Sequence, residues 1–281
     1  MAVPLGEVID ALDARYDPGL AESWDAVGLV CGDRDEPVRR VLFAVDPTAD
    51  VVDELVEAGA ELLVTHHPLF LSGVHGVPAD DPKGRLVHRL IRAGAALFVS
   101  HTNADRTAGC GVNDALAAVL GLEGTAPLEP APGRPGTGLG RVGRLATPVS
   151  LGEFAERAAA ALPVTAGGVR IAGDLGREVR TVAVCGGSGA SLMDAAAAAG
   201  ADVFLTSDLK HHSVSEWQQS VRVAVCDVAH FATEWPWLPV ASDLLERDLS
   251  GRIEASVSLR RTDPWTGHVG QSEEPADSAV G

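Results

Sequence analysis

The sequence predicts an α/β fold made of two related halves, each with a mixed, largely parallel sheet and flanking helices. Apolar runs of strand length alternate with helix-length segments that end at glycine, which is typical of parallel pairing. The same order of segments occurs twice in the 281 residues, and residues 58–65 closely resemble residues 199–206. The repetition indicates two halves with one architecture.

The first half follows the pattern from a short apolar strand onwards. Asp46-Pro47-Thr48 is a turn and helix-start signal, and Gly59 ends the helix that follows. We expect strand 41–45, helix 49–58, strand 61–65, helix 84–93 and strand 95–99.

The second half repeats this order after a helix predicted at 151–161. Gly186-Gly187-Ser188-Gly189 stands between its first strand and the next helix. We expect strand 181–185, turn 186–189, helix 191–199, strand 202–206, helix 214–219 and strand 221–225.

Proline and glycine between the two patterns mark a linker. The predicted domains are therefore a first half at 1–125, a linker at 126–140, a second half at 141–268 and a flexible acidic tail at 269–281.

Composition narrows the function classes. An apolar content of 46% indicates a packed core, and the net charge of −17 argues against direct nucleic-acid binding, which requires basic side chains to displace counterions. No apolar stretch is long enough to span a bilayer. The four cysteines form no CxxC pair, and the N-terminus has no signal-peptide pattern. We expect a cytoplasmic protein without a membrane partner.

Six of the nine histidines fall in four short stretches, each at or soon after a predicted strand end. In open α/β folds, ligands bind at the carboxyl ends of strands. Each half contains a His-His pair and then a histidine four residues before a carboxylate, and nitrogen and oxygen donors of this kind suit zinc, iron, manganese or nickel. The four stretches are His66-His67, His101 with Asp105, His211-His212, and His230 with Glu234.

Alternatives remain for individual residues. Paired histidines can simply cap a strand, and Asp105 can be a helix N-cap. The turn at residues 186–189 resembles a phosphate-binding turn, but a tight strand-to-helix turn explains it equally well. The shared position of all four histidine stretches favours a metal site at the strand ends, between the two halves.

These motifs together resemble the Nif-three-like dinuclear metal-centre hexamer family, whose bacterial members are often named GTP cyclohydrolase 1 type 2 homologues. The resemblance spans residues 1 to 265 in the order of the family. It is carried by the segments ESWDAVGL (22–29), THHPLF (65–70), HTNAD (101–105), GVND (111–114), CGGSG (185–189), ADVFLTSDLKHH (201–212) and AHFATE (229–234).

The resemblance implies two divalent metal ions and a toroidal homohexamer. His67 and Asp105 would hold one ion, His66 and His230 the other, and Glu234 would bridge them. His101, His211 and His212 would lie beside the metals or in the substrate pocket.

From these residues we expect a metal-dependent hydrolase acting on a nucleotide or related phosphorylated small molecule. His101 and His212 are the expected proton-transferring residues, and Lys210, His211 and Ser188 are expected to bind substrate. The alternative is a non-catalytic metal-binding protein, such as a metallochaperone or a scaffold.

Overall fold

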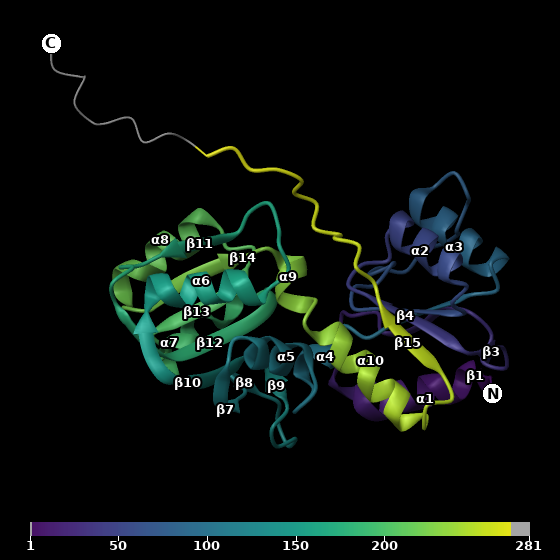
Figure 1. Cartoon of the computed structure of the whole chain (residues 1–281), viewed down its shortest axis with the longest axis horizontal. Helices are drawn as coiled ribbons and strands as arrows, with labels where there is room; N and C mark the ends of the chain where they lie inside the picture. Colours follow the sequence, from purple (N-terminus) through teal and green to yellow (C-terminus); the bar gives the residue numbers. More distant parts are fainter. Residues whose placement is uncertain (1, 271–281) are drawn as a thin grey trace, which may run out of the picture.

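The computed structural model describes residues 2–270 (Figure 1). It confirms the predicted fold class, with two α/β halves in which mixed sheets are flanked by helices. Residues 271–281, the greater part of the predicted acidic tail, lie outside the described residues. No helix in the described part of the chain is long and apolar enough to cross a membrane.

The first sheet has five strands in the order β15-β4-β5-β6-β2. Its central strands are parallel, and only β2 at one edge runs antiparallel. Helices α2 and α3 pack on one face, whereas α1 and α10 cover the other. The bounds are α1 Leu5–Arg15, β2 Gly28–Cys31, β4 Arg40–Ala44, α2 Ala49–Ala58, β5 Leu62–Thr65, α3 Pro82–Arg92, β6 Ala96–Val99, α10 Trp237–Asp248 and β15 Glu254–Val257.

The second sheet has six strands in the order β11-β14-β13-β12-β10-β7. Its centre, β12-β13-β14, is parallel. Helices α5 and α6 pack on one face, and α7 and α8 on the other. The bounds are α5 Val112–Val119, β7 Leu122–Ala126, β10 Arg141–Ser150, α6 Leu151–Ala161, β11 Val169–Ala172, β12 Glu178–Ser188, α7 Met193–Ala198, β13 Val203–Ser207, α8 His211–Ser220 and β14 Ala224–Val228.

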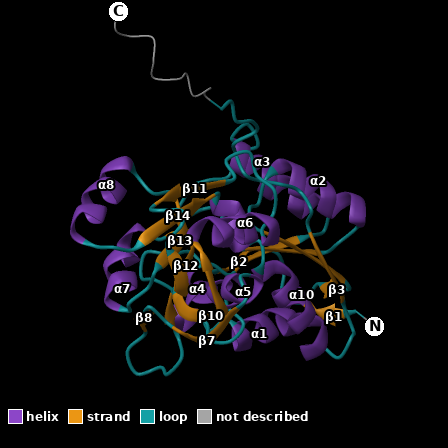
Figure 2. Cartoon of the chain, turned by 60° about the vertical axis from the view of Figure 1, so that its left-hand side comes forward, coloured by secondary structure: helices purple, strands orange, loops and turns teal. Residues whose placement is uncertain are grey.

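Each half has one short helix after its last predicted strand. Helix α4 (Thr102–Arg106) follows β6, and α9 (His230–Glu234) follows β14. Figure 1 shows α9 between the two sheets, and Figure 2 shows α4 and α5 in the centre of the molecule. Two small antiparallel pairs complete the fold: β1 (Val3–Pro4) with β3 (Pro37–Val38), and β8 (Glu129–Pro130) with β9 (Gly138–Leu139).

Local signals determine where several helices begin and end. The Thr48 hydroxyl accepts a hydrogen bond from the amide of Val51 at the start of α2. Gly59 ends that helix in the left-handed conformation, with φ 61°. Ser150 caps α6 in the same way as Thr48 caps α2. The predicted bounds 49–58 and 151–161 are both confirmed.

The chain crosses between the halves at places other than those predicted. The predicted halves are continuous in sequence, but β7 pairs in the second sheet and β15 returns to pair with β4 in the first. Because β15 covers the open edge of β4, that edge is not left with unpaired backbone groups. The predicted linker also contains the β8–β9 pair.

Candidate metal centre

The Glu234 carboxylate is the centre of a histidine cluster between the two sheets. Its side chain is 3% exposed. The oxygen Oε1 lies 2.9 Å from His230 Nε2 and 3.5 Å from His66 Nε2, while Oε2 lies 3.1 Å from His67 Nε2. One carboxylate therefore faces three imidazoles from two different segments.

Asp105 and His101 extend this cluster on the side of the first half. Asp105 Oδ1 lies 3.6 Å from His66 Nε2. The ring of His101 lies 5.1 Å from that of His66 and 5.6 Å from that of His67, between centroids. The structure thus brings together all five predicted metal ligands and His101.

Each histidine of the cluster is held through its other ring nitrogen. His67 Nδ1 lies 2.7 Å from Asp46, His101 Nδ1 lies 2.8 Å from Asp25, and His230 Nδ1 lies 2.7 Å from Asp208. His66 Nδ1 lies 3.0 Å from the backbone oxygen of Ser100. With Nδ1–H donating to these oxygens, every Nε2 faces the cluster, and in a neutral imidazole it carries the lone pair that a metal requires.

The three carboxylates behind the histidines were not among the predicted site residues. Asp46 was interpreted only as a turn and helix-start residue, although it lies two residues past the end of β4. Asp208 directly follows β13 and has an unusual positive φ of 58°. A carboxylate just after a parallel strand was the signal that could have revealed both.

Charges in the cluster oppose the cost of burial. Burial alone would raise the pKa of Glu234, but His67, His66 and His230 lower it well below the ordinary value. Burial would lower the pKa of His67, whereas Glu234 and Asp46 raise it to about 11. The pKa of His230 is raised to about 9, because Glu234 and Asp208 outweigh its burial. Without a metal, protons on these histidines balance the carboxylate.

Divalent cations would satisfy the buried polar atoms of the cluster better than its side chains satisfy one another. His66 Nε2 and Asp105 Oδ1 are buried and have no hydrogen-bond partner among residues 2–270, which is costly for polar atoms. Two sets of ligand atoms each lie within 4.8 Å of one another: those of His66, His67 and His101, and those of His67, His230 and Glu234. Such nitrogen and oxygen donors suit zinc, iron, manganese or nickel.

The geometry groups the ligands differently from the implied pairing. His66, not His67, is the neighbour of Asp105, and His67 lies with His230. The ring centroids of His67 and His230 are 5.1 Å apart. His66 and His67 follow the end of β5, and both rings face Glu234, with their centroids 5.1 Å apart.

Residues 3–264 match the model of the family described as Duf34/NIF3 (NGG1p interacting factor 3). The chain belongs to the Duf34/NIF3 family. A protein of Streptomyces coelicolor named GTP cyclohydrolase 1 type 2 homolog is 53% identical, over 99% of this chain and 98% of its own length. A protein of Mycobacterium tuberculosis with the same name is 37% identical, over 94% of this chain and 97% of its own length.

Two solved structures have the same fold as this chain. A Bacillus cereus protein related to NIF3 superposes with a TM-score of 0.87, covering 94% of this chain and 99% of its own, at 24% identity. A hypothetical protein of Staphylococcus aureus gives a TM-score of 0.85, covering 94% of this chain and 98% of its own, at 28% identity. The fold of the NIF3 family is thus shared along nearly the whole chain.

The glycine turn of this NIF3-family chain forms part of the metal centre. Strand β12 continues through the predicted turn to Ser188, and Gly187 has φ 66°. A Cβ atom on Gly187 would lie 2.5 Å from Glu234 Oε1 and 3.0 Å from His230 Nε2. The absence of a side chain at residue 187 therefore leaves the space that the ligands occupy. Ser188, a predicted substrate-binding residue, is exposed at the end of β12.

The second His-His pair lies elsewhere in the NIF3 fold. His211 and His212 begin helix α8 and are exposed, and the His212 side chain, 85% exposed, lies 3.8 Å from Glu216 on the same helix. Lys210 is the exposed residue before that helix. Among the described residues, no recorded contact joins these three side chains to the cluster. The helix starts earlier than the predicted residue 214, and this places both histidines on its solvent side.

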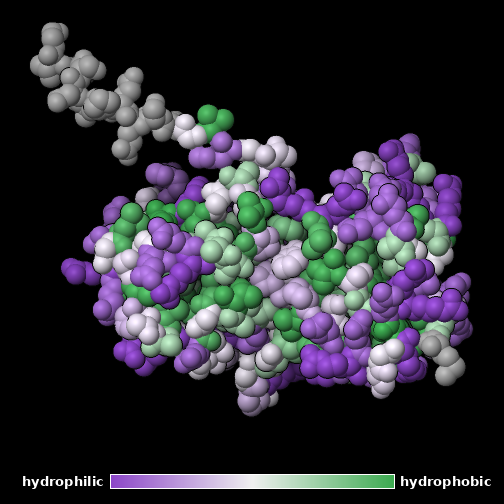
Figure 3. All heavy atoms as spheres, viewed as in Figure 1, coloured by the Kyte–Doolittle hydropathy of each residue, from purple (hydrophilic) through white to green (hydrophobic). Residues whose placement is uncertain are grey.

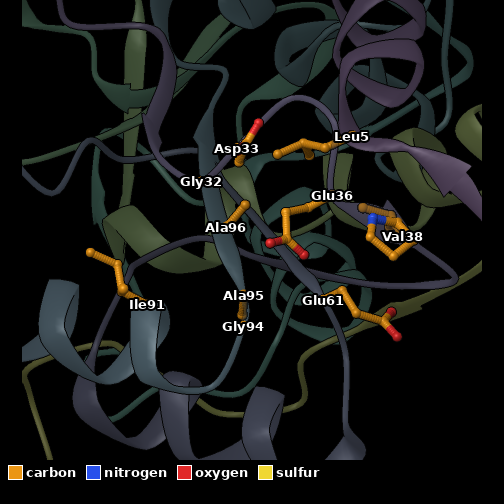
Figure 4. A pocket seen from close by; sticks show the side chains of 11 residues that line it. Leu5, Gly32, Asp33, Glu36, Val38, Glu61, Ile91, Gly94, Ala95 and Ala96 are labelled. Carbon is orange, nitrogen blue, oxygen red and sulfur yellow. The ribbon is translucent and has the colours of Figure 1, made fainter.

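Two cavities border the metal centre, and another lies far from it. One of about 350 Å³ touches His230 and Asp208, and one of about 430 Å³ touches His67 and Asp46. A further, mostly apolar cavity of about 310 Å³ is lined by Leu5, Glu61 and Ala96 (Figure 4). Glu61 and Ala96 lie at the N-terminal ends of β5 and β6, whereas His66 follows the C-terminal end of β5. This cavity is therefore at the other edge of the sheet from the cluster.

Proposed function

We propose that the protein is a metal-dependent hydrolase with two divalent cations, acting on a nucleotide or a related phosphorylated small molecule. His66 and Asp105 would hold one cation, His67 and His230 would hold the other, and the Glu234 carboxylate would serve both. The observation that carries the proposal is the buried Glu234 carboxylate, which faces three imidazole nitrogens.

Two divalent cations supply a Lewis acid that makes water nucleophilic near neutral pH and stabilises the negative charge that develops on the substrate. The residues of the chain prepare the site for this chemistry. Asp46 and Asp208 fix the rings of His67 and His230, and burial keeps competing water away from Glu234.

His101 is the proposed proton-transferring residue. Asp25 accepts a hydrogen bond from its Nδ1, and this fixes the ring with Nε2 towards the cluster. The Trp24 ring packs against it edge-on, with centroids 6.1 Å apart. His212, the other residue predicted for proton transfer, is not proposed, because its exposed place on α8 keeps it out of the cluster.

The proposed substrate class is based on the name of the relatives. Their name, GTP cyclohydrolase 1 type 2 homolog, suggests GTP. Hydrolysis of phosphate esters is equally compatible with a pair of metal ions. Homohexamer formation and a cytoplasmic location remain predictions, and sedimentation of the purified protein tests the first.

A non-catalytic metal-binding or metal-delivery role is the second candidate. It is favoured by partial exposure of two ligands, since the side chains of His67 and His230 are 23% and 33% exposed. A cation held by these two residues could be exchanged with a partner without unfolding the site.

Metal analysis combined with a substrate panel distinguishes the two roles. The purified protein is assayed on GTP and on a set of phosphoesters, beside Glu234→Gln and, as a control, Glu216→Gln on the exposed face of α8. The hydrolase proposal predicts turnover in wild type and in Glu216→Gln, with both metal content and turnover lost in Glu234→Gln.

Full metal occupancy without turnover on any substrate would favour the metal-delivery role. Metal content unchanged in Glu234→Gln would contradict both roles at this site.

A further inference from the structure

The cavity beside His67 differs from the rest of the chain in the charge of its lining residues. It measures about 430 Å³, a size that accommodates a small molecule, and is lined by the start of α2 and by α3. The two helices are neighbours in Figure 1. Its inner wall includes His67 and Asp46, so it adjoins the metal centre directly. Figure 3 shows mainly hydrophilic residues over the outer parts of the two helices.

Positive charge is concentrated in this cavity. Its charged lining residues other than His67 are Lys83, Arg85, Arg89 and Asp46, so cations outnumber carboxylates three to one. The whole chain has the opposite balance, with 22 basic and 39 acidic residues. A local excess of positive charge in so acidic a protein points to an anionic ligand.

Lys83 is the cation most available to a ligand. Its ammonium lies 5.9 Å from the centre of the Phe70 ring, and it makes no ion pair with any described residue. Arg85 donates to the backbone oxygens of Ala79 and Asp80, which position its guanidinium without neutralising it. Arg89 differs, because it pairs with Asp53.

The start of α2 adds backbone donors to the same cavity. Thr48 and Ala49, the N-cap and the first residue of this ten-residue helix, both line it. The amide of Thr48 donates to the Asp46 backbone oxygen and that of Val51 to the Thr48 hydroxyl, so the first-turn amides left to favour an anion are those of residues 49 and 50.

The opposite cavity, beside His230, has the reverse balance. Its lining carboxylates are Asp208, Asp227 and Asp263, and its one arginine, Arg170, is paired with Asp227. A phosphate would be repelled there. The two cavities that border the metals are therefore not equivalent for an anionic substrate.

We propose that a phosphate group of the substrate binds in the cavity of Lys83 and Arg85, so that the reacting part of the molecule extends past His67 to the metals. This deepens the proposed function and rests on it. Lys210, predicted from the sequence to bind substrate, then has no part in phosphate binding. The substrate class is a phosphorylated molecule, bound by its phosphate on the α2–α3 side of the metal centre.

Calorimetric titration of inorganic pyrophosphate into the metal-loaded protein tests this without any assay of turnover. Lys83→Ala and Arg85→Ala are each expected to weaken binding roughly tenfold, as for loss of a charge-assisted hydrogen bond. Arg157→Ala, which removes an exposed arginine of α6, is the matched control and should bind like wild type.

Lys210→Ala completes the test, because Lys83 and Lys210 are the only lysines in the chain. Weakening by Lys210→Ala but not by Lys83→Ala would overturn the proposal, as would equal affinity in all variants. The titration is repeated on protein from which a chelator has removed the metal. This excludes binding of pyrophosphate directly to metal ions. A Lys83-dependent affinity in a protein that turns over no substrate would refute the hydrolase while leaving the phosphate site intact.

Discussion

The two His-His pairs follow nearly the same sequence but lie in different environments. In the first half His66 and His67 directly follow β5, and both point into the metal centre. In the second half four residues separate Thr206 from His211, and the pair becomes the exposed start of α8. The number of residues after the strand, not the motif, decides whether a histidine reaches the strand-end site.

The matching strand pairings show what replaces the first pair in the second half. Leu62 pairs with Val41 and Val203 with Val182, so Thr65 corresponds to Thr206. Ser207 and Asp208 therefore occupy the places of His66 and His67. Asp208 has no ligand role in our proposal but holds the ring of His230. One half contributes imidazoles at these positions, whereas the other contributes a carboxylate that holds an imidazole.

The same correspondence places Gly187 at the position of Asp46 and gives the largest predicted effect. Gly187→Ala should abolish metal binding and cost about 1–3 kcal/mol of stability, because its Cβ would overlap Glu234 Oε1 in a left-handed backbone. Gly200→Ala is the control, since its φ is 72° but nothing lies within 4 Å of its Cβ. Metal content and thermal unfolding check both variants, and equal behaviour would contradict the role of Gly187.

Opposite pH dependences are expected for the metal-free and the metal-loaded protein. The pKa values of His67 and His230, about 11 and about 9, are raised above the ordinary value, so their stabilising pairing with Glu234 is present below about pH 6.5. It is lost as pH rises through about 9 and then about 11. Metal ions displace these protons, so their affinity should instead rise with pH.

Thermal unfolding between pH about 7 and 10 checks this, with one sample chelated and the other metal-loaded. The chelated protein should lose stability as pH rises, and the stabilisation by metal should grow. Parallel curves would show that these histidines do not exchange protons for metal.

Smaller effects are expected at the residues that orient the histidines. Asp208→Asn and Asp46→Asn should each weaken metal affinity about 10- to 100-fold, because the amide holds the ring less strongly and makes Nε2 less basic. Asp243→Asn, at an exposed position on α10, is the control. Competition with a metal-binding dye measures the affinities. An affinity in Asp208→Asn equal to that of the control would mean that the second half does not support His230 in this way.

The sequence contains enough information for the fold class and for the histidine stretches at strand ends, because strand ends and the histidine–carboxylate spacing are local features. The choice of five ligands among these residues came from the family resemblance. Helices 49–58 and 151–161 were predictable for the same reason. The roles of Asp25, Asp46 and Asp208 were not predictable, since each contacts a histidine at least 21 residues away in sequence. The return of β15 to the first sheet also depends on a contact between distant segments.

The most direct test of the account is the metal content of two double variants. His66→Ala/His67→Ala and His211→Ala/His212→Ala remove the same chemical groups from the two halves, and elemental analysis of both proteins compares them with wild type. We predict loss of metal in the first variant and wild-type content in the second. Metal loss in the His211/His212 variant, or its retention in the His66/His67 variant, would contradict the assignment of the metal centre.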